Sequence, residues 1–542
     1  MILDVAACRP GEIALDDLVR RRTWAELVDR ATRTARLFRD GLGLRPDDHA
    51  ALLMGNRVEL VETVLGAMMA GIWLTPINRH LQGDEIAYIV ADSGARVVIA
   101  DDEHRALLAG APATGEHRAS IGTGPVHDEH GTPGGGARAE AADDARAPTR
   151  TAPLVLTAGP ELDAALAAVS DAPLPLDGPA GGTMMYTGGT TGRPKGVQRA
   201  RAASLGAALA GAGTAGAAIG LDGSGPHLVT GPLYHAAPLL FAVYDLLNGA
   251  PMIVMPRWDP AATLALIAER GVRHTHLVPT MFVRLLRLPE EARRAFDPAP
   301  LALVLHGAAP IGVEVKRAMI DWWGPVLVEY WGATEGGVCT LVGAPDWLAH
   351  PGTVGRAVPA YEVFATDDDG RRLPAGETGT LYCRHVQLAR PFEYHRAASK
   401  TAEAYHPTGA FTTGDVGRVD AEGWVHLSDR KSHMIITGGV NVYPAEVEQV
   451  LQLHPAVADA GVFGIPDDEW GESVKAAVEL ADGVAGSPAL AAEILAFARQ
   501  RLARYKVPRS IDFMARLPRH PTGKLLVRLL REPYWQGRER RI

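Results

Sequence analysis

The segment that decides the fold is Tyr186-Thr-Gly-Gly-Thr-Thr-Gly-Arg-Pro-Lys-Gly-Val197, and a second segment, Pro518-Arg-His-Pro-Thr-Gly-Lys524, lies near the C-terminus. The first segment places glycines around two threonines, with Lys195 close behind. Glycine lets the backbone turn several N–H groups toward one point, and the hydroxyls and the ammonium add further donors. Such a segment is typical of a loop that holds a polyphosphate. It is not the common P-loop, because the spacing G-x-x-x-x-G-K-[ST] does not occur in it.

The composition is that of a globular enzyme. A chain of 542 residues is too long for one compact core, so about two to four domains are expected. The chain is 47% hydrophobic and 22% charged, which is ordinary for a soluble protein. The net charge of −9 and the absence of clustered Lys and Arg argue against a nucleic-acid partner.

Cysteine usage and the N-terminus indicate a cytoplasmic location. Cys8, Cys339 and Cys383 form no C-x-x-C pair and no disulfide framework. The N-terminus lacks a basic region followed by an apolar stretch, so we expect no signal peptide. The longest uncharged run, residues 202–221, is mostly Ala and Gly. It is too weakly apolar for a membrane span and predicts a buried helix with a small-residue packing face.

Short apolar runs alternate with helical patterns through the first two thirds of the chain. The runs at 97–100 and 252–255 are typical of buried parallel strands, and 262–270 and 314–323 are typical of helices. This alternation predicts stacked α/β layers. Shorter strand patterns and turns over residues 361–427 predict a small β subdomain, and a new unit of helices and strands begins after residue 431.

We therefore predict an α/β fold with two domains. Residues 1–429 form a large N-terminal domain of stacked α/β layers with a small β subdomain, residues 430–433 a hinge, and residues 434–542 a smaller, mobile α+β domain. Residues 111–152 show no apolar periodicity and are interpreted as a flexible surface insertion. His127-Asp-Glu-His130 within it has no matching His or Cys cluster, so we predict no metal site there.

Five motifs in order carry a family resemblance. The two segments above, with Tyr330-Trp-Gly-Ala-Thr-Glu335, Thr413-Gly-Asp415 and Asp429-Arg430, resemble the motif set of the adenylate-forming superfamily of AMP-dependent synthetases and ligases. The resemblance runs from about residue 10 to about residue 530, and fatty-acyl-CoA synthetases are the most similar members. It implies attack of a carboxylate on the α-phosphorus of ATP, followed by attack of a thiol, usually coenzyme A, on the acyl-AMP. ATP, Mg²⁺ and coenzyme A are the cofactors and co-substrates so implied.

The resemblance assigns roles around the phosphates. Lys524 would bridge the attacking carboxylate and the α-phosphate, and Thr334 would bind the α-phosphate. Glu335 would be the Mg²⁺ ligand, because a hard cation that bridges phosphates prefers a carboxylate. The β- and γ-phosphates would be held by Thr187, Gly188, Gly189, Thr190, Thr191, Gly192 and Lys195.

Adenosine and coenzyme A sites are implied in the same way. Trp331 would stack on adenine, with a buried core aromatic as the alternative, and Glu329 beside Tyr330 would accept from the adenine amino group. Asp415 would accept both ribose hydroxyls and Arg430 would add a ribose or phosphate contact. Ser432 stands where the family commonly has a charged hinge residue. The opposite adenine wall would comprise Gly307, Ala308 and Ala309, and the pantetheine tunnel Gly438 and Gly439.

The acyl pocket is expected to draw on His235, Phe241, Met281, Phe282 and Gly332. Acetyl-selective members of the family carry a tryptophan where Gly332 stands. Glycine there is expected to leave the tunnel open, so that activity rises with chain length and Gly332→Trp admits only short acids.

We therefore expect an acyl-CoA synthetase for a medium-chain, long-chain or steroid-like acid that acts on small molecules without a nucleic-acid partner or a transmembrane segment; a homodimer is a further expectation. The alternatives are an aryl-CoA ligase, a stand-alone amide synthetase, or a degenerate nucleotide-binding protein, which the complete motif set argues against. An acyl-AMP ligase that serves carrier proteins usually has an extra insertion after the core of the large domain. We find no such insertion near residues 340–400 of this sequence.

Overall fold

The computed structural model describes residues 2–110, 153–187, 194–430, 433–437, 440–467, 470–519 and 523–536. Several predictions fall outside these ranges and are not tested by the structure. They concern the glycine-rich loop at 188–192, the insertion at 111–152 with His127 and His130, the hinge residue Ser432, and the pair Gly438 and Gly439.

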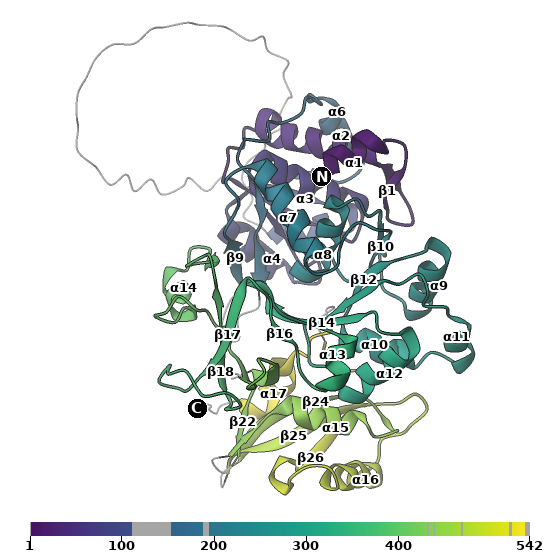
Figure 1. Cartoon of the computed structure of the whole chain (residues 1–542), viewed down its shortest axis with the longest axis vertical. Coiled ribbons are helices and arrows are strands. Elements are labelled where there is room, and N and C mark those ends of the chain that lie inside the picture. The colour runs from purple at the N-terminus through teal and green to yellow at the C-terminus, as the bar shows by residue number, and fades with distance from the viewer. Residues whose placement is uncertain are drawn as a thin grey trace, which may run out of the picture.

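The largest sheet lies at the centre of the N-terminal domain (Figure 1). Its middle strands are parallel, and both edges are antiparallel. Short strands rich in buried apolar residues suit a parallel sheet that is covered on both faces. In spatial order the strands are β16 (Arg356–Ala357), β15 (Gly337–Gly343), β14 (Leu327–Ala333), β13 (Leu303–His306), β12 (His274–Leu277), β10 (His227–Val229), β11 (Met252–Val254), β1 (Ile13–Asp16) and β2 (Arg21–Thr23).

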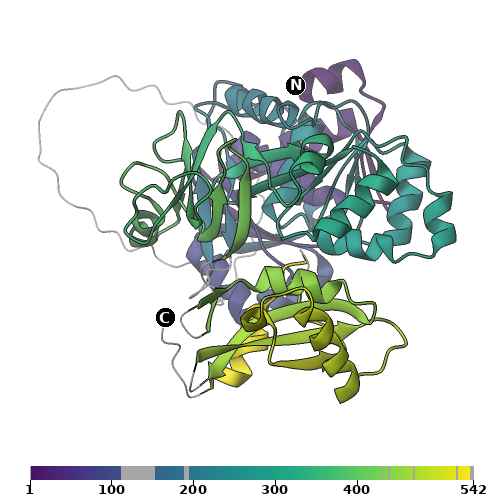
Figure 2. The same ribbon diagram turned by 60° about the horizontal axis from the view of Figure 1, so that its bottom comes forward.

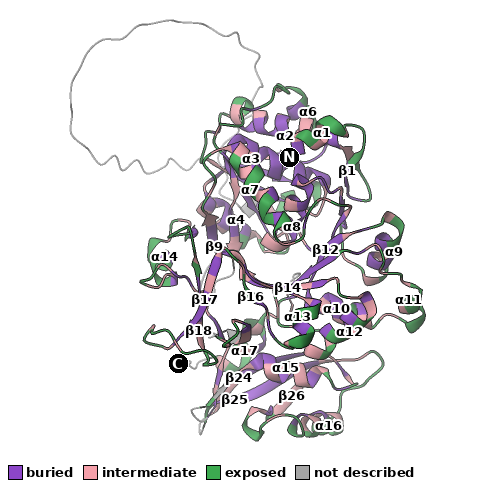
Figure 3. Cartoon of the chain, viewed as in Figure 1, coloured by how far each residue is buried: buried purple, intermediate pink, exposed green. Residues whose placement is uncertain are grey.

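Helices cover both faces of this sheet. One face packs on α9 (Pro260–Arg270), α10 (Pro279–Leu286) and α12 (Val313–Trp323), with the small α11 (Glu290–Ala295) and α13 (Ala344–Ala349) beside them. The other face packs on α8 (Ala236–Leu247), and α7 (Leu205–Ala217) packs against α8. Figure 3 shows the strands buried between helices whose outer faces are exposed.

A second, fully parallel sheet stands beside the first. Its order is β6 (Leu154–Thr157), β5 (Ala95–Ala100), β3 (His49–Leu53), β4 (Trp73–Pro76) and β7 (Gly182–Thr183). The core on one face includes α2 (Trp24–Arg36), α3 (Val58–Ala70) and α6 (Pro160–Ala167), and the core on the other includes α4 (Gly83–Ser93). The smaller elements nearby are α1 (Ile2–Cys8), η1 (Leu37–Gly41), α5 (Asp102–Arg105) and η2 (Ala106–Gly110).

Two antiparallel sheets lie in the region of the predicted β subdomain, and one of them also takes in two strands from residues 185–199. One has the order β19 (Phe392–Tyr394), β9 (Lys195–Arg199) and β8 (Met185–Thr187). The other has the order β17 (Tyr361–Thr366), β18 (Gly379–His385), β20 (Asp415–Val419) and β21 (Val425–Arg430), and α14 (Ala398–Ala404) packs beside β19. The predicted α/β architecture of the large domain is confirmed.

The strands after β21 belong to a separate sheet. It comprises β23 (Val440–Val442), β22 (Ile435–Thr437), β25 (Gly471–Leu480), β24 (Val457–Asp467) and β26 (Ser510–Met514), accompanied by α15 (Pro444–Gln452), α16 (Pro488–Arg499), η3 (Arg504–Lys506) and α17 (Val527–Trp535). This small domain lies below the large one in Figures 1 and 2. It touches the large domain where Arg287 Nη2 donates to the carbonyls of Val457 at 3.2 Å and Ala458 at 2.5 Å.

Helix α7 corrects the prediction of a buried helix over residues 202–221. Only Leu205, Leu209, Gly213 and Gly216 are buried, and its other side is exposed. The small residues serve one contact, because a Cβ at Gly216 would meet the Tyr244 side chain of α8 at 2.9 Å. Among the described residues, no helix is both long enough and apolar enough to cross a bilayer.

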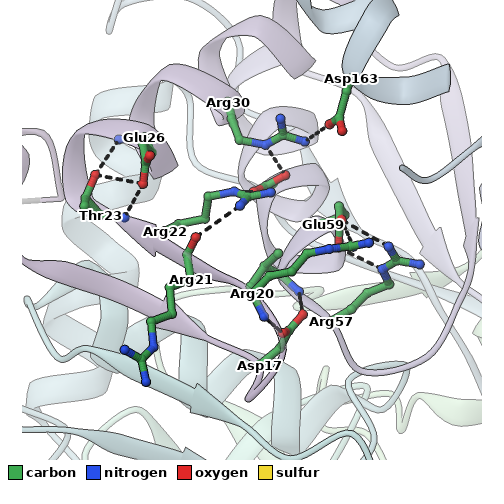
Figure 4. Close-up of polar contacts among 12 residues, drawn as sticks. Asp17, Arg20, Arg21, Arg22, Thr23, Glu26, Arg30, Arg57, Glu59 and Asp163 are labelled. Carbon is green, nitrogen blue, oxygen red and sulfur yellow. Dashed lines mark hydrogen bonds and ion pairs between the residues drawn. The ribbon is translucent and has the colours of Figure 1, made fainter. Parts of the chain in front are cut away.

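A buried ion-pair network joins the first helices (Figure 4). Thr23 and Glu26 form the capping box of α2, as their spacing predicts. Further along this helix Arg30 Nε donates to Glu62 of α3 at 2.6 Å, and Arg22 Nε donates to the other Glu62 oxygen at 2.7 Å. Glu62 is 1% exposed, so its charge depends on these two guanidinium groups.

Replacement of Glu62 by Gln should therefore destabilise the large domain. The change leaves two cations beside a neutral amide in a buried site, and we expect unfolding to become easier by about 3 kcal/mol. Thermal and denaturant unfolding will measure this, with Asp163→Asn as the matched control because the Asp163 partner of Arg30 is half exposed. Equal stability of the Glu62→Gln and Asp163→Asn variants would show that burial does not make the Glu62 pairs important.

Candidate active site

The site lies at the edge of the sheet where the parallel strands end. Thr230 follows β10, Val278 follows β12, Ala308 follows β13 and Thr334 follows β14. All four line one cavity of about 2730 Å³. Ligands of open α/β sheets bind at this carboxyl edge, because neighbouring loops diverge there and leave a crevice. The cavity extends to the small domain, whose Arg519, Lys524 and α17 also line it.

Thr187 and Lys195 stand at the two ends of the glycine-rich segment. They are paired across β8 and β9, and both line the cavity. The Lys195 ammonium lies 5.0 Å from the centre of the Tyr394 ring. Next to Thr187, the Tyr186 hydroxyl donates to Asp92 at 2.6 Å and holds this end of the segment against α4. The predicted phosphate loop therefore starts and ends on the cavity wall.

Thr334 and Glu335 lie side by side on the same wall. The Tyr394 hydroxyl donates to Glu335 Oε1 at 2.9 Å, so one tyrosine contacts both Glu335 and Lys195. Among the described residues, no group of three or more His, Cys, Asp or Glu could hold a metal ion. A single carboxylate nevertheless fits Mg²⁺, which proteins commonly bind through one or two carboxylates together with substrate phosphates.

Lys524 reaches the cavity from a turn of the small domain. Arg519 donates twice to Asp459, at 2.5 and 2.7 Å, and once to the Gly523 carbonyl at 2.7 Å. Gly523 has a left-handed φ of +81°, and a side chain there would meet the Thr280 hydroxyl of α10 at 2.5 Å. A residue with a Cβ would strain this turn and push it away from α10. Glycine at position 523 therefore allows both the left-handed backbone conformation and the close approach to α10.

Asp415 and Trp331 are joined behind the cavity wall. Trp331 Nε1 donates to Asp415 Oδ2 at 3.1 Å, and the Thr413 hydroxyl donates to the same oxygen at 2.7 Å. Trp331 packs in the core of the β subdomain and does not line the large cavity. Trp331 therefore takes the alternative position, that of a buried core aromatic, and its indole holds Asp415.

Glu329 also points away from the site where the sequence analysis placed it. Successive side chains on a strand point to opposite faces, so Tyr330 faces the cavity while Glu329 faces the core under α12. The Glu329 carboxylate accepts from Lys316 Nζ at 2.5 Å, and both side chains are buried. Burial raises the pKa of Glu329 and lowers that of Lys316, and their attraction opposes both shifts. The adenine contact predicted for Glu329 is thus wrong.

The acyl end of the cavity is largely apolar. We call acyl compartment the part of the lining that surrounds Phe241, and its members are Ile219, Ala237, Phe241, Tyr244, His276, Tyr330, Val338 and Leu341. His235 and Met281 also line the cavity, as predicted. Phe282 does not, because it follows Met281 on α10 and its ring is fully buried against His306 in the opposite core.

The glycines of this wall have a different role from the one predicted. Gly332 lines the cavity, but a Cβ there would lie 1.9 Å from the Gly337 carbonyl oxygen of β15. The space expected to be open is filled by backbone, so Gly332→Trp would disrupt the β14–β15 pairing rather than shorten the tunnel. Gly307 is similarly closed off by Tyr330, at 2.5 Å. Of the predicted Gly307, Ala308 and Ala309 wall, only Ala308 lines the cavity, with a left-handed φ of 65°.

Two contacts at the cavity wall were missed from the sequence. Tyr394 reaches Glu335 only because β19 pairs with β9, and no local pattern marks this pairing. His276 Nε2 and the Tyr330 hydroxyl are 3.0 Å apart on the acyl wall. An isolated His in a strand pattern gives no sign that it faces a cavity.

Comparison with known proteins agrees with this geometry. The AMP-binding enzyme family matches residues 3–392, and the AMP-binding enzyme C-terminal domain matches residues 446–524. The chain therefore belongs to the AMP-binding, adenylate-forming enzymes, and it is an acid–thiol ligase of that family.

Individual relatives cover nearly the whole chain. It is 32% identical to the long-chain-fatty-acid–CoA ligase FadD13 of Mycobacterium tuberculosis, over 95% of this chain and 93% of that one. It is 34% identical to a feruloyl-CoA synthase of Amycolatopsis sp, over 93% and 92%. The crystal structure of ATP-bound MatB from Rhodopseudomonas palustris matches with a TM-score of 0.78 and 28% identity, over 96% and 95%.

Glu329→Gln should reduce stability and leave nucleotide affinity alone. Loss of the carboxylate leaves Lys316 as an uncompensated buried cation, which we expect to cost about 3 kcal/mol of unfolding free energy. Thermal unfolding and the KM for ATP will be measured together. A large rise of the KM with unchanged stability would instead indicate that Glu329 contacts the nucleotide.

Tyr394→Phe should slow acyl-AMP formation. The variant keeps the ring beside Lys195 but loses the hydrogen bond that orients Glu335, and loss of such an orienting contact commonly costs about tenfold or more in metal affinity or activity. Acid-dependent pyrophosphate release at several Mg²⁺ concentrations will measure it, and the deficit should shrink as Mg²⁺ rises. The matched control is Tyr361→Phe, which loses a hydroxyl bound to the Gly336 carbonyl on the same cavity wall. An equal deficit in both variants would mean that Tyr394 has no special role.

Proposed function

We propose that the protein is an ATP-dependent acyl-CoA synthetase that activates a carboxylic acid with a largely apolar body, of medium or long chain length or steroid-like. The observation that carries this proposal is that Lys195, Thr334, Glu335 and Lys524 line a single cavity that continues into the acyl compartment. The side chains that surround Phe241 in that compartment are mainly apolar, which favours an acid with a largely apolar body. Cytoplasmic location and a homodimer stay predictions.

In the first step a carboxylate oxygen attacks the α-phosphorus of ATP. The bond from the α-phosphorus to the bridging oxygen breaks, and pyrophosphate leaves with the electron pair. Both reactants are anions, so fixed cations and hydrogen-bond donors at the cavity supply the main stabilisation. Lys524 would bridge the two, Thr334 would donate to the α-phosphate, and Lys195 with the segment at 188–192 would hold the outgoing phosphates. Mg²⁺, held by Glu335, would neutralise phosphate charge when bound.

In the second step the coenzyme A thiol loses its proton and its sulfur attacks the acyl carbonyl, which releases AMP. The thiol needs a path to the carbonyl. In the first step the turn that carries Lys524 would occupy this path. We propose that the small domain rotates about residues 430–433 between the two steps. We also propose that Asp415 and Arg430 bind the ribose. Gly438 and Gly439 would line the path of the pantetheine.

An aryl acid is the alternative substrate class. A relative at 34% identity is named as a feruloyl-CoA synthase, and Phe241, Tyr244 and Tyr330 give the acyl compartment an aromatic wall. Flat rings pack well against such a wall. Pyrophosphate release across fatty, steroid-like and aryl acids, with and without coenzyme A, will distinguish the classes. Product formation only with an added amine would indicate the amide synthetase instead.

Lys524→Ala should separate the two half-reactions. If Lys524 stabilises only the first transition state, its loss should cost about 3 kcal/mol in that step, as for one oxyanion-hole donor. Thioester formation from supplied acyl-AMP should continue at a rate close to that of the parent enzyme. Rapid-mixing measurement of each half-reaction provides the test.

The matched control is Arg528→Ala, which removes another cation of the small domain from the same cavity. It should affect the first step far less than Lys524→Ala. Equal damage to both half-reactions in the Lys524 variant would contradict the assigned role.

A further inference from the structure

Two hydrogen-bonding side chains interrupt the apolar wall of the acyl compartment. His276 Nε2 and the Tyr330 hydroxyl lie 3.0 Å apart, and both residues line the cavity. Apart from the Tyr244 hydroxyl, the other side chains of the compartment are apolar. Burial of a polar group in an apolar wall costs free energy unless the group is hydrogen-bonded.

The position of the pair is set by the sheet. His276 lies on β12 and Tyr330 on β14, and the intervening β13 places Leu305 opposite His276. The two rings therefore reach each other across β13 on the face turned to α8. Phe241 of α8 packs on both, with ring centres 5.5 Å from His276 and 5.1 Å from Tyr330. This packing leaves the two rings little freedom to turn.

The pair keeps unused hydrogen-bonding capacity. A neutral imidazole has one donor and one acceptor, and a phenol has one donor and two acceptor sites, whereas their mutual bond uses one of each. If His276 donates, the Tyr330 O–H remains available, and if Tyr330 donates, its oxygen can still accept. The same pair can thus serve a hydroxyl or a carbonyl on a ligand.

The pair is uncharged, which restricts the chemical groups that it can bind. His276 is 3% exposed, and burial lowers its pKa to about 3, so the imidazole stays neutral. Burial also raises the pKa of Tyr330. A second carboxylate bound by the pair would require a cation in contact with it, whereas the ring that packs on both members is that of Phe241. A neutral oxygen remains as the group that fits.

We propose that the acid activated by this enzyme carries a hydroxyl or ketone oxygen on its otherwise apolar body, and that Tyr330 with His276 binds this oxygen. The inference rests on the proposed function and specifies its substrate class. A plain hydrocarbon acid would leave the pair without a ligand partner, whereas an oxygenated acid satisfies it. Such a site favours the oxygenated acid, because that acid alone uses the hydrogen-bonding capacity that remains beyond the bond between His276 and Tyr330.

Matched pairs of acids test the proposal. The probes are decanoate with its hydroxy and keto forms substituted at successive carbons, cinnamate with its para-hydroxy form, and a steroid-like acid with and without a ring ketone. Pyrophosphate release gives kcat/KM for each member, and the ratio of the oxygenated to the plain acid is the readout. We expect at least one pair to give a ratio of about ten or more.

Tyr330→Phe and Tyr244→Phe form the matched set of variants. Each loses one hydroxyl from the acyl compartment and keeps its ring, so both should fold. The ratio should fall close to one in Tyr330→Phe and persist in Tyr244→Phe. A ratio that survives Tyr330→Phe, or that disappears only in Tyr244→Phe, would overturn the proposal.

Failure of this inference can be told apart from failure of the proposed function. If plain acids are activated and no oxygenated acid is preferred, the polar subsite is wrong while the synthetase stands. If no acid in the panel releases pyrophosphate, the proposed function itself fails, and the subsite with it.

Discussion

In strand β14 the extended backbone sends neighbouring side chains to opposite faces, and the rest of the site depends on this alternation. Tyr330 faces the acyl compartment, whereas Glu329 is paired with Lys316 in the core and Trp331 holds Asp415 at the base of the β subdomain. Thr334 and Glu335 follow directly after this strand on the cavity wall. One segment thus joins the acyl wall, a buried ion pair and the proposed phosphate and metal contacts, and a register shift there would displace all of them.

The small domain completes the cavity through a single turn. Arg519 fixes this turn to Asp459 with two charge-assisted hydrogen bonds, and Gly523 lets it approach α10 closely. Lys524 is therefore positioned from within the small domain but lines a cavity whose other walls belong mainly to the large one. Among the described residues, the two domains meet where Arg287 donates to the carbonyls of Val457 and Ala458 and where Gly523 approaches Thr280. A contact of this kind is easily exchanged for another, which suits a domain that moves between two steps.

Much of the fold was predictable because it depends on local patterns. The buried runs at 97–100 and 252–255 became parallel strands, and the Thr23–Glu26 capping box starts a helix as its spacing predicts. The motif residues Lys195, Thr334, Glu335 and Lys524 do line one cavity. The errors at Glu329, Phe282 and Gly332 share one cause: the sequence names the segment that borders a site but not the direction in which each side chain points. Tyr394 was missed because strand pairing across the fold brings it to Glu335.

We propose that this arrangement of the two domains makes acyl-AMP and that thioester formation requires another arrangement. The most direct measurement is to replace Arg287 and Ala458 by Cys in a Cys8→Ser background and join them with a short bismaleimide, since Cys339 and Cys383 are buried. The joined enzyme should release one pyrophosphate per molecule with ATP and acid, and should retain acyl-AMP when coenzyme A is added. The unjoined variant should complete both steps. Thioester production by the joined enzyme at the rate of the unjoined one would contradict the account.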